Sequence, residues 1–137
     1  MDERLRNFYL ESRVKSASPG QLLILLYEGL VHIAEDAESQ LAAPAGSEER
    51  SLAPASVSRC IDIITELSTS LRHEIDPELC ATLGNLYAFF ARQFAGALSH
   101  TDPRRISSIL PLLRELSEAW TKAEKLSGQA QLTGAAV

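Results

Sequence analysis

The chain has 137 residues, a net charge of −5 and 45% hydrophobic residues, a composition typical of one globular domain rather than a disordered segment. No block of Lys and Arg stands out, which argues against a nucleic acid or an anionic membrane as the partner. The N-terminus leads into no secretory signal, and no apolar run approaches the roughly 20 residues that span a bilayer. We therefore expect a cytosolic protein that does not insert into membranes.

Residues 1–15 carry a few apolar side chains among charges, a pattern that fits either a short helix or an extended arm. The side chains of Phe8, Tyr9 and Val14 are too few to form a core of their own. We expect this N-terminal arm to rest on another apolar surface, because two exposed aromatic rings would otherwise leave an uncovered patch.

The first long helix is predicted to run from about Pro19 to Ala42. Ser18 is the expected N-cap, Pro19 suits the first helical position, and Gln21 completes a capping box. Further apolar residues lie beside the main apolar stripe. Together they form a broad apolar face, which indicates a helix covered by more than one other helix. The stripe comprises Leu22, Leu26, Leu30, Ile33, Ala37 and Leu41.

The segment 42–56 is rich in Ala, Pro, Gly and Ser and predicts a loop, with Pro54 entering the next helix. A second helix follows, and Ile63 lies beside its apolar face. Cys60 on this helix and Cys80 on the next one occupy apolar stripes, so we expect two buried free thiols rather than a disulfide.

A third helix is predicted from about Pro77 to Ser99, with Asp76 as its cap. Beside its main apolar face runs a stripe of small residues, which lets another helix approach closely. Either a helix of the same bundle or a partner fills this stripe, and the pattern favours neither. Phe89 lies outside the main apolar face and is a candidate exposed aromatic. The small stripe consists of Gly84, Ala88, Ala91 and Ala95.

A fourth helix is predicted after Asp102-Pro103, with Trp120 in the core. Pro111 falls inside its apolar pattern and should kink the helix or move its true start later. Residues 127–137 are expected to be a flexible tail. Four helices with short loops and no strand pattern predict a single all-α domain over residues 1–137, an antiparallel up-and-down four-helix bundle with an N-terminal arm or short extra helix.

The sequence shows no signature of an enzyme. Di-iron bundles need Glu-x-x-His pairs, and no Glu stands three residues before His32, His73 or His100. Gly-rich phosphate loops, Cys-x-x-Cys motifs and nucleophile elbows are also missing from the sequence. We therefore expect no catalysis, no metal and no cofactor, and a protein that acts by binding another molecule.

Several segments occur in the order and spacing of a known family: S-A-S-P-G-Q-L at 16–22, L-Y-E-G at 26–29, I-x-x-I-x-x-L at 61–67, L-x-x-L-Y-x-F at 83–89 followed by Arg92, and E-A-W at 118–120. Across about residues 8–123 the chain resembles the FliS family of flagellin-specific export chaperones. It departs from the family pattern at Gln93, at Ala97-Leu98, at Pro111 and in the longer loop 42–56.

The resemblance implies a non-catalytic cytoplasmic chaperone that binds the C-terminal region of flagellin. Such a chaperone prevents premature polymerisation of flagellin and keeps it competent for flagellar type III secretion. An export-gate component, an anti-sigma factor or a co-chaperone is a further partner that the resemblance suggests. The alternative from another class is a regulatory or scaffolding helical bundle that binds a different amphipathic helix.

The resemblance also suggests which residues bind flagellin. These are the small stripe of Gly84, Ala88, Ala91 and Ala95, Phe89 and Arg92 at its edge, and Ile63 on the second helix. In the family the segment that matches Phe8, Tyr9 and Val14 lies over part of this surface, so we expect the arm to occupy some of it when flagellin is absent.

Overall fold

The computed structural model describes residue 4 and residues 18–135, with side chains up to Ser127. Within these residues all regular secondary structure is helical, which confirms the predicted all-α class. The segment that contains Phe8, Tyr9 and Val14 lies outside the described residues. The elements are α2 (Pro19–Ala42), α3 (Glu48–Ser51), α4 (Ala53–Thr69), α5 (Pro77–Ser99), α6 (Arg104–Ser107) and α7 (Leu110–Ala135).

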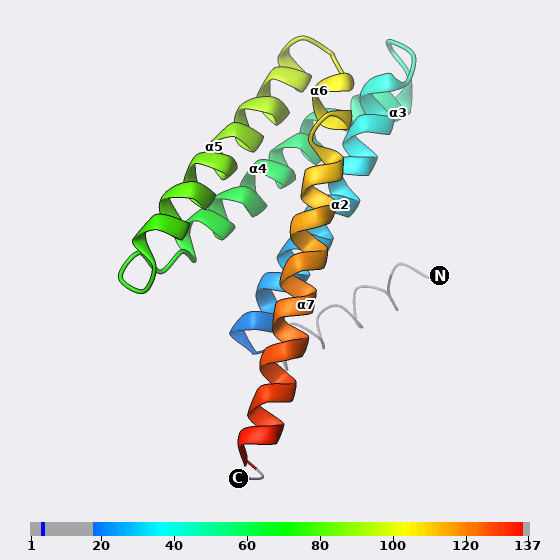
Figure 1. Ribbon diagram of the computed structural model, residues 1–137. Coiled ribbons are helices and arrows are strands. Elements are labelled where there is room, and N and C mark those ends of the chain that lie inside the picture. The colour runs from blue at the N-terminus through cyan, green and yellow to red at the C-terminus, as the bar shows by residue number, and fades with distance from the viewer. Residues whose placement is uncertain (1–3, 5–17, 136–137) are drawn as a thin grey trace.

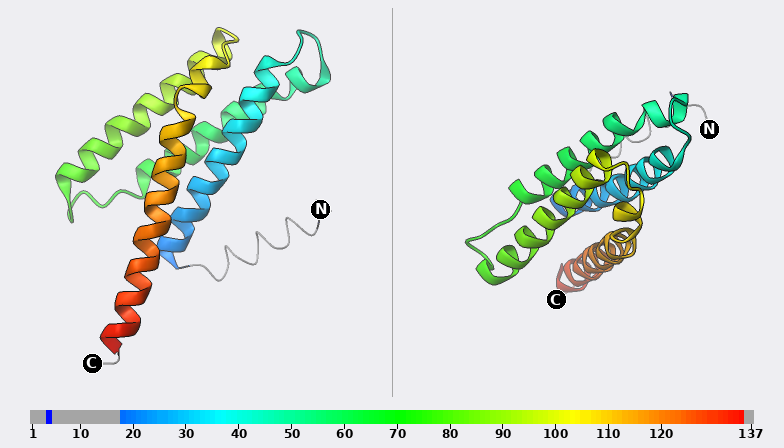
Figure 2. Two further views of the ribbon diagram at one scale, coloured as in Figure 1. Left: turned by 45° about the vertical axis from the view of Figure 1, so that its right-hand side comes forward. Right: turned by 90° about the horizontal axis from the view of Figure 1, so that it is seen from above.

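The long helices α2, α4, α5 and α7 alternate in direction and form an antiparallel bundle (Figure 1). The helix α2 packs against both α4 and α7, and α4 packs against α5. The bundle is not closed evenly, because α5 and α7 diverge from each other below the short helix α6 (Figure 2). The predicted up-and-down bundle is thus confirmed, with one side more open than an ideal bundle would be.

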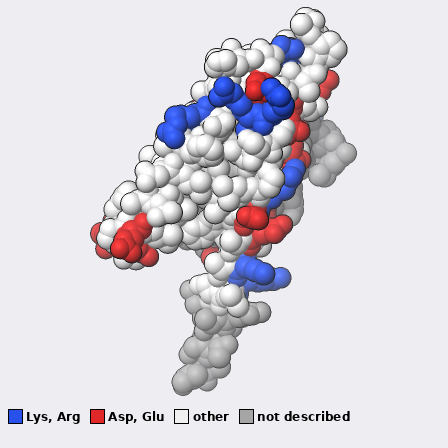
Figure 3. All heavy atoms as spheres, turned by 45° about the horizontal axis from the view of Figure 1, so that its top comes forward, with Lys and Arg blue, Asp and Glu red and all other residues white. Residues whose placement is uncertain are grey.

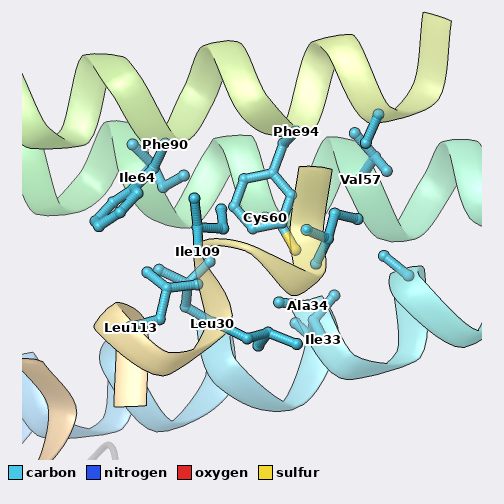
Figure 4. Close-up of a cluster of buried hydrophobic side chains, with 14 of the residues drawn as sticks. Leu30, Ile33, Ala34, Val57, Cys60, Ile64, Phe90, Phe94, Ile109 and Leu113 are labelled. Carbon is cyan, nitrogen blue, oxygen red and sulfur yellow. The ribbon is translucent and has the colours of Figure 1, made fainter. Parts of the chain in front are cut away.

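Apolar side chains from all four long helices form one continuous core. Figure 4 shows Phe90 and Phe94 of α5 among side chains of α2 and α4 and of the start of α7. Cys60 and Cys80 are both buried and free, as predicted. The largest fully buried side chains are Tyr27, Tyr87, Phe90, Phe94, Leu30, Leu67, Ile106, Leu113, Val57 and Cys60.

The predicted start signals form the expected caps. The backbone N–H of Gln21 donates to Ser18 Oγ at 3.2 Å, and the N–H of Ser18 donates to Gln21 Oε1 at 2.9 Å. At the start of α5 the N–H of Leu79 donates to Asp76 Oδ1 at 3.1 Å. Each bond satisfies a backbone donor that has no partner inside its own helix.

The structure differs from the sequence prediction between residues 42 and 56. This segment is not entirely loop, because α3 forms one helical turn after Ser47, whose Oγ accepts the Arg50 N–H at 3.1 Å. The following helix, α4, begins at Ala53 with Pro54 in its first turn, as predicted. A side-chain cap with two glutamates in the first turn is enough to order a short helix within an Ala- and Pro-rich connection.

The predicted fourth helix is divided in two. Pro111 is the second residue of α7, so the true start of the long helix is later than Asp102-Pro103 indicated, and α6 precedes it as a separate turn. Trp120 is half-buried rather than fully enclosed. The backbone of the expected tail is helical up to Ala135, and its flexibility stays a prediction.

Candidate functional site

Exposed apolar side chains gather along α5 and in the turn before it. Ile75 is 71% exposed, Leu79 47% and Phe89 39%. Among the described residues there is no group of three His, Cys, Asp or Glu side chains that could hold a metal, and no helix is both long and apolar enough to cross a membrane. Because these exposed apolar side chains gather there, the surface of α5 is the best candidate site, and its chemistry suits an apolar partner.

The first turns of α5 border an apolar cavity of about 210 Å³. Leu79 and Leu83 line it from α5, and Trp120 lines it from α7. Leu23 of α2 and Ile75 of the turn before α5 complete its apolar lining, together with Leu71, Cys80 and Tyr87. We call this cavity the α5–α7 groove; Phe89 lies farther along α5 and does not line it.

The position of Phe89 on α5 follows from the helical repeat. Gly96 comes seven residues after Phe89, so both lie on nearly the same side of α5. A Cβ atom added at Gly96 would lie 2.6 Å from Nη1 of Arg105, which shows that α6 covers α5 there. Phe89 therefore lies on the side of α5 that α6 approaches, and its ring lies beside that of Phe90 with a centroid distance of 6.1 Å.

Three aromatic residues join the helices beneath the groove. The hydroxyls of Tyr27 and Tyr87 share a hydrogen bond of 2.5 Å between α2 and α5, and the Trp120 ring stacks on Tyr27 with a centroid distance of 6.4 Å. Burial raises the pKa of both tyrosines, for Tyr87 further through its bond to Tyr27, so both hydroxyls stay neutral. The floor of the groove is thus fixed by a hydrogen-bonded pair and not by packing alone.

The other flank of α5 carries the small stripe that the sequence predicted. Gly84 and Ala91 are half-buried, whereas Ala88 and Ala95 are exposed. A Cβ at Gly84 would lie 4.0 Å from Leu71, which follows α4. Ala95 borders a shallow apolar depression lined from α4 by Pro54, Val57, Ser58 and Ile61. The helix α4 therefore lies along this flank without covering it.

The structure does not bring all the predicted site residues together. Arg92 is exposed and lies one turn after Ala88, next to the small stripe as expected. Phe89 follows Ala88 and precedes Arg92 by three residues, so it lies on the side of Arg92 away from the stripe. Ile63 is directed toward α2, with its Cδ1 3.9 Å from a Cβ built at Gly29, and so lies at the α2–α4 interface away from the stripe.

Sequence reasoning did not identify the α5–α7 groove. Leu79 falls on the main apolar face of α5 by its spacing, and Trp120 falls on that of α7, so the pattern assigns both to the core. They are exposed or half-buried because the two helices diverge. Ile75 gives the one available signal, since it is an isolated apolar residue in a charged turn.

Comparison with known proteins agrees with this picture of a binding protein. The family described as flagellar protein FliS matches residues 1–127. The flagellar secretion chaperone FliS of Vibrio cholerae is 26% identical over 81% of this chain and 79% of its own length. Those of Bacillus subtilis and Escherichia coli are 26% and 28% identical over 84% and 83% of this chain and 82% of their own lengths. Because the family match spans nearly the whole chain, this protein belongs to the FliS family of flagellar proteins.

Proposed function

We propose that this protein is a cytosolic export chaperone that binds the C-terminal region of flagellin, prevents its premature polymerisation and keeps it competent for flagellar type III secretion. It acts by binding and performs no catalysis. An export-gate component, an anti-sigma factor or a co-chaperone is a further partner in this proposal. The named relatives are flagellar secretion chaperones, which supports the proposal.

One observation carries the proposal: α5 has apolar surface on both flanks that no described helix covers completely. The small stripe exposes Ala88 and Ala95, the α5–α7 groove exposes Leu79, and Phe89 is exposed farther along α5. An amphipathic helix binds to such surfaces by placing apolar side chains, three or four residues apart, into the groove. Flagellin segments that become helical only against a partner would find two apolar surfaces on one helix here.

The small stripe is the more specific part of this surface. Residues without long side chains allow two helix backbones to approach closely, so a bound helix would lie nearer to α5 there than bulky residues would permit. Arg92, one turn after Ala88, would remain at the edge of such a contact, where it can pair with an acidic group of the client.

The substitution Ala88→Arg tests this proposal. It places a long charged side chain on the stripe, and because Ala88 is exposed we expect the fold and the melting temperature to be preserved. Calorimetric titration with a flagellin C-terminal peptide should show binding to the parent chain and at least about a tenfold weaker affinity for the variant, a loss of roughly 1.4 kcal/mol.

Ala55→Arg is the matched control, since Ala55 is an exposed alanine of α4 that lines neither surface. It should bind the peptide like the parent chain. If the parent chain does not bind the peptide, the proposed function is wrong. If Ala88→Arg unfolds the protein, the stripe is instead filled by the bundle itself.

A further inference from the structure

The long helix α7 leaves the bundle after Glu124. Among the α7 residues whose side chains the structure describes, Glu124 is the last one that is not exposed. Lys125, Leu126 and Ser127 follow it and are all exposed, Leu126 by 65%. Figures 1 and 2 show the start of α2 beside this part of α7, and α7 then continues past the bundle. The contact of Glu124 with α2 therefore marks the end of the interface between the two helices.

The Glu124 carboxylate lies on the first turn of α2. Ser18 Oγ donates to Glu124 Oε1 at 3.5 Å. A Cβ atom built at Gly20 would lie 2.6 Å from Glu124 Cδ and closer still to Oε2, so the carboxylate fits here because residue 20 has no side chain. The helix α2 has no acidic residue of its own in its first turn. Glu124 thus supplies from another helix the negative charge that stabilises the positive end of α2.

This contact lies next to the α5–α7 groove. Leu23 follows Gly20 by three residues, and Trp120 precedes Glu124 by four, so each lies about one helical turn from the contact. Both Leu23 and Trp120 line the cavity, and the Trp120 ring stacks on Tyr27 of α2. The separation of α2 and α7 at the contact therefore determines how closely Trp120 lies against the other walls of the cavity.

We propose that Gly20 and Glu124 form a latch that controls access to the α5–α7 groove. With the carboxylate on the start of α2, the second half of α7 is held against α2 and Trp120 stays against the cavity. When the carboxylate leaves, this half of α7 separates from α2, because Thr121, Lys122 and Ala123 are exposed and do not hold it. The latch goes beyond the proposed function and does not depend on what the protein binds.

The single tryptophan of the chain reports the state of the latch, because Trp120 is the only one in the sequence. Glu124→Gln keeps the size of the side chain and removes its charge. In this variant acrylamide should quench Trp120 more strongly than in the parent chain. Amide hydrogen exchange in residues 120–127 should be about three- to tenfold faster, the range expected for one carboxylate at a helix N-terminus. Exchange in α4 and α5 should not change, whereas a general loss of stability would speed exchange in every helix.

Figure 3 shows acidic and basic side chains close together where α7 leaves the bundle, so the test needs controls for charge alone. Glu115→Gln removes the same charge from an exposed position of α7 and should change neither measurement. Ser18→Asp keeps a good N-cap but places a second carboxylate against Glu124, so it should open the latch as Glu124→Gln does. Ser47→Asp makes the same change at the N-cap of α3 and should leave Trp120 unaffected.

Gly20→Ala tests the close approach of the two helices. The new Cβ displaces the carboxylate, and since this is the far end of a flexible side chain, the fold should be kept. Acrylamide should then quench Trp120 more strongly, and Gly20→Ala should have no further effect in a Glu124→Ala background. Unchanged quenching and unchanged α7 exchange in Glu124→Gln, Ser18→Asp and Gly20→Ala would overturn the latch. Equal effects of Gly20→Ala with and without Glu124 would also overturn it.

Discussion

The Tyr27–Tyr87 pair places two hydroxyl groups in a largely apolar core. Its hydroxyls lie 2.5 Å apart, each is the other's hydrogen-bond partner, and both rings are almost completely buried. A buried hydroxyl costs free energy unless it is hydrogen-bonded, so the two residues must occur together. The pair thereby specifies the relative position of α2 and α5, which a purely apolar contact would fix less precisely.

A double-mutant cycle tests this role. Tyr87→Phe or Tyr27→Phe alone leaves one buried hydroxyl without this partner and should lower the free energy of unfolding by about 1–3 kcal/mol. The double variant should lose clearly less than the sum of the two single losses, because it leaves neither hydroxyl of the pair behind. Urea denaturation of the four proteins measures the coupling. Additive losses would show that the hydroxyls contribute independently.

The buried thiol of Cys60 should make the stability of the protein fall at alkaline pH. Burial raises the pKa of its thiol from the ordinary 9.0 to about 12. Because the unfolded chain releases this proton at lower pH than the folded chain, the stabilisation is complete below pH 9 and is lost as the pH rises toward 12. Between pH 8 and pH 10 the free energy of unfolding should fall by about 1 kcal/mol from this group.

The Cys60→Ala variant provides the comparison. It should be less stable than the parent chain at pH 8, because a fully buried side chain is shortened. Its stability should also fall less steeply between pH 8 and pH 10, which denaturation at each pH under reducing conditions will show. Parallel pH curves for the two proteins would mean that the thiol ionises equally easily in both states.

At the level of the elements, local sequence signals define where the long helices begin. Ser18 and Asp76 accept backbone hydrogen bonds at the predicted caps, because capping depends only on residues within one turn. The structure departs from prediction where the conformation of a segment depends on contacts with other parts of the chain. Pro111 interrupts an apolar pattern that otherwise continues from Ile106 to Trp120, and spacing alone cannot show whether a helix kinks or restarts.

The place of Pro111 gives a prediction for α7. At the second helical position its missing N–H removes no hydrogen bond, so Pro111→Ala should lower the free energy of unfolding by no more than about 1 kcal/mol, through the greater freedom of the unfolded chain. A proline in the middle of the same helix, as in Ala119→Pro, should cost about 3 kcal/mol or more. Thermal denaturation compares the two. Comparable losses would mean that residues 104–120 behave as one continuous helix.

Only part of the candidate site could be predicted from the sequence. The small stripe was found because Gly84, Ala88, Ala91 and Ala95 recur at helical spacing, and the structure places them on one flank of α5. The spacing of residues within one helix does not show which neighbouring helix each of its flanks contacts. For this reason Ile63, which meets α2, was grouped with residues of another surface, and the α5–α7 groove beside the first turns of α5 was missed.

At the level of the whole molecule, the bundle is incomplete on one side. The contacts of α2 with α4 and α7, and of α4 with α5, enclose the core, while α5 and α7 diverge. A closed four-helix bundle would bury Leu79 and Trp120 more completely between α5 and α7. Here the same apolar residues remain accessible, which suits a protein whose remaining helix comes from a client.

Polymerisation of flagellin tests this account most directly. Monomeric flagellin is mixed with filament seeds and an equimolar amount of the chain, and filament growth is followed by light scattering. We expect the parent chain and Ala55→Arg to suppress growth, and Ala88→Arg to restore it, because the client's C-terminal segment is then free to join the filament. Filaments that grow at the same rate and to the same extent with and without the parent chain would contradict the account.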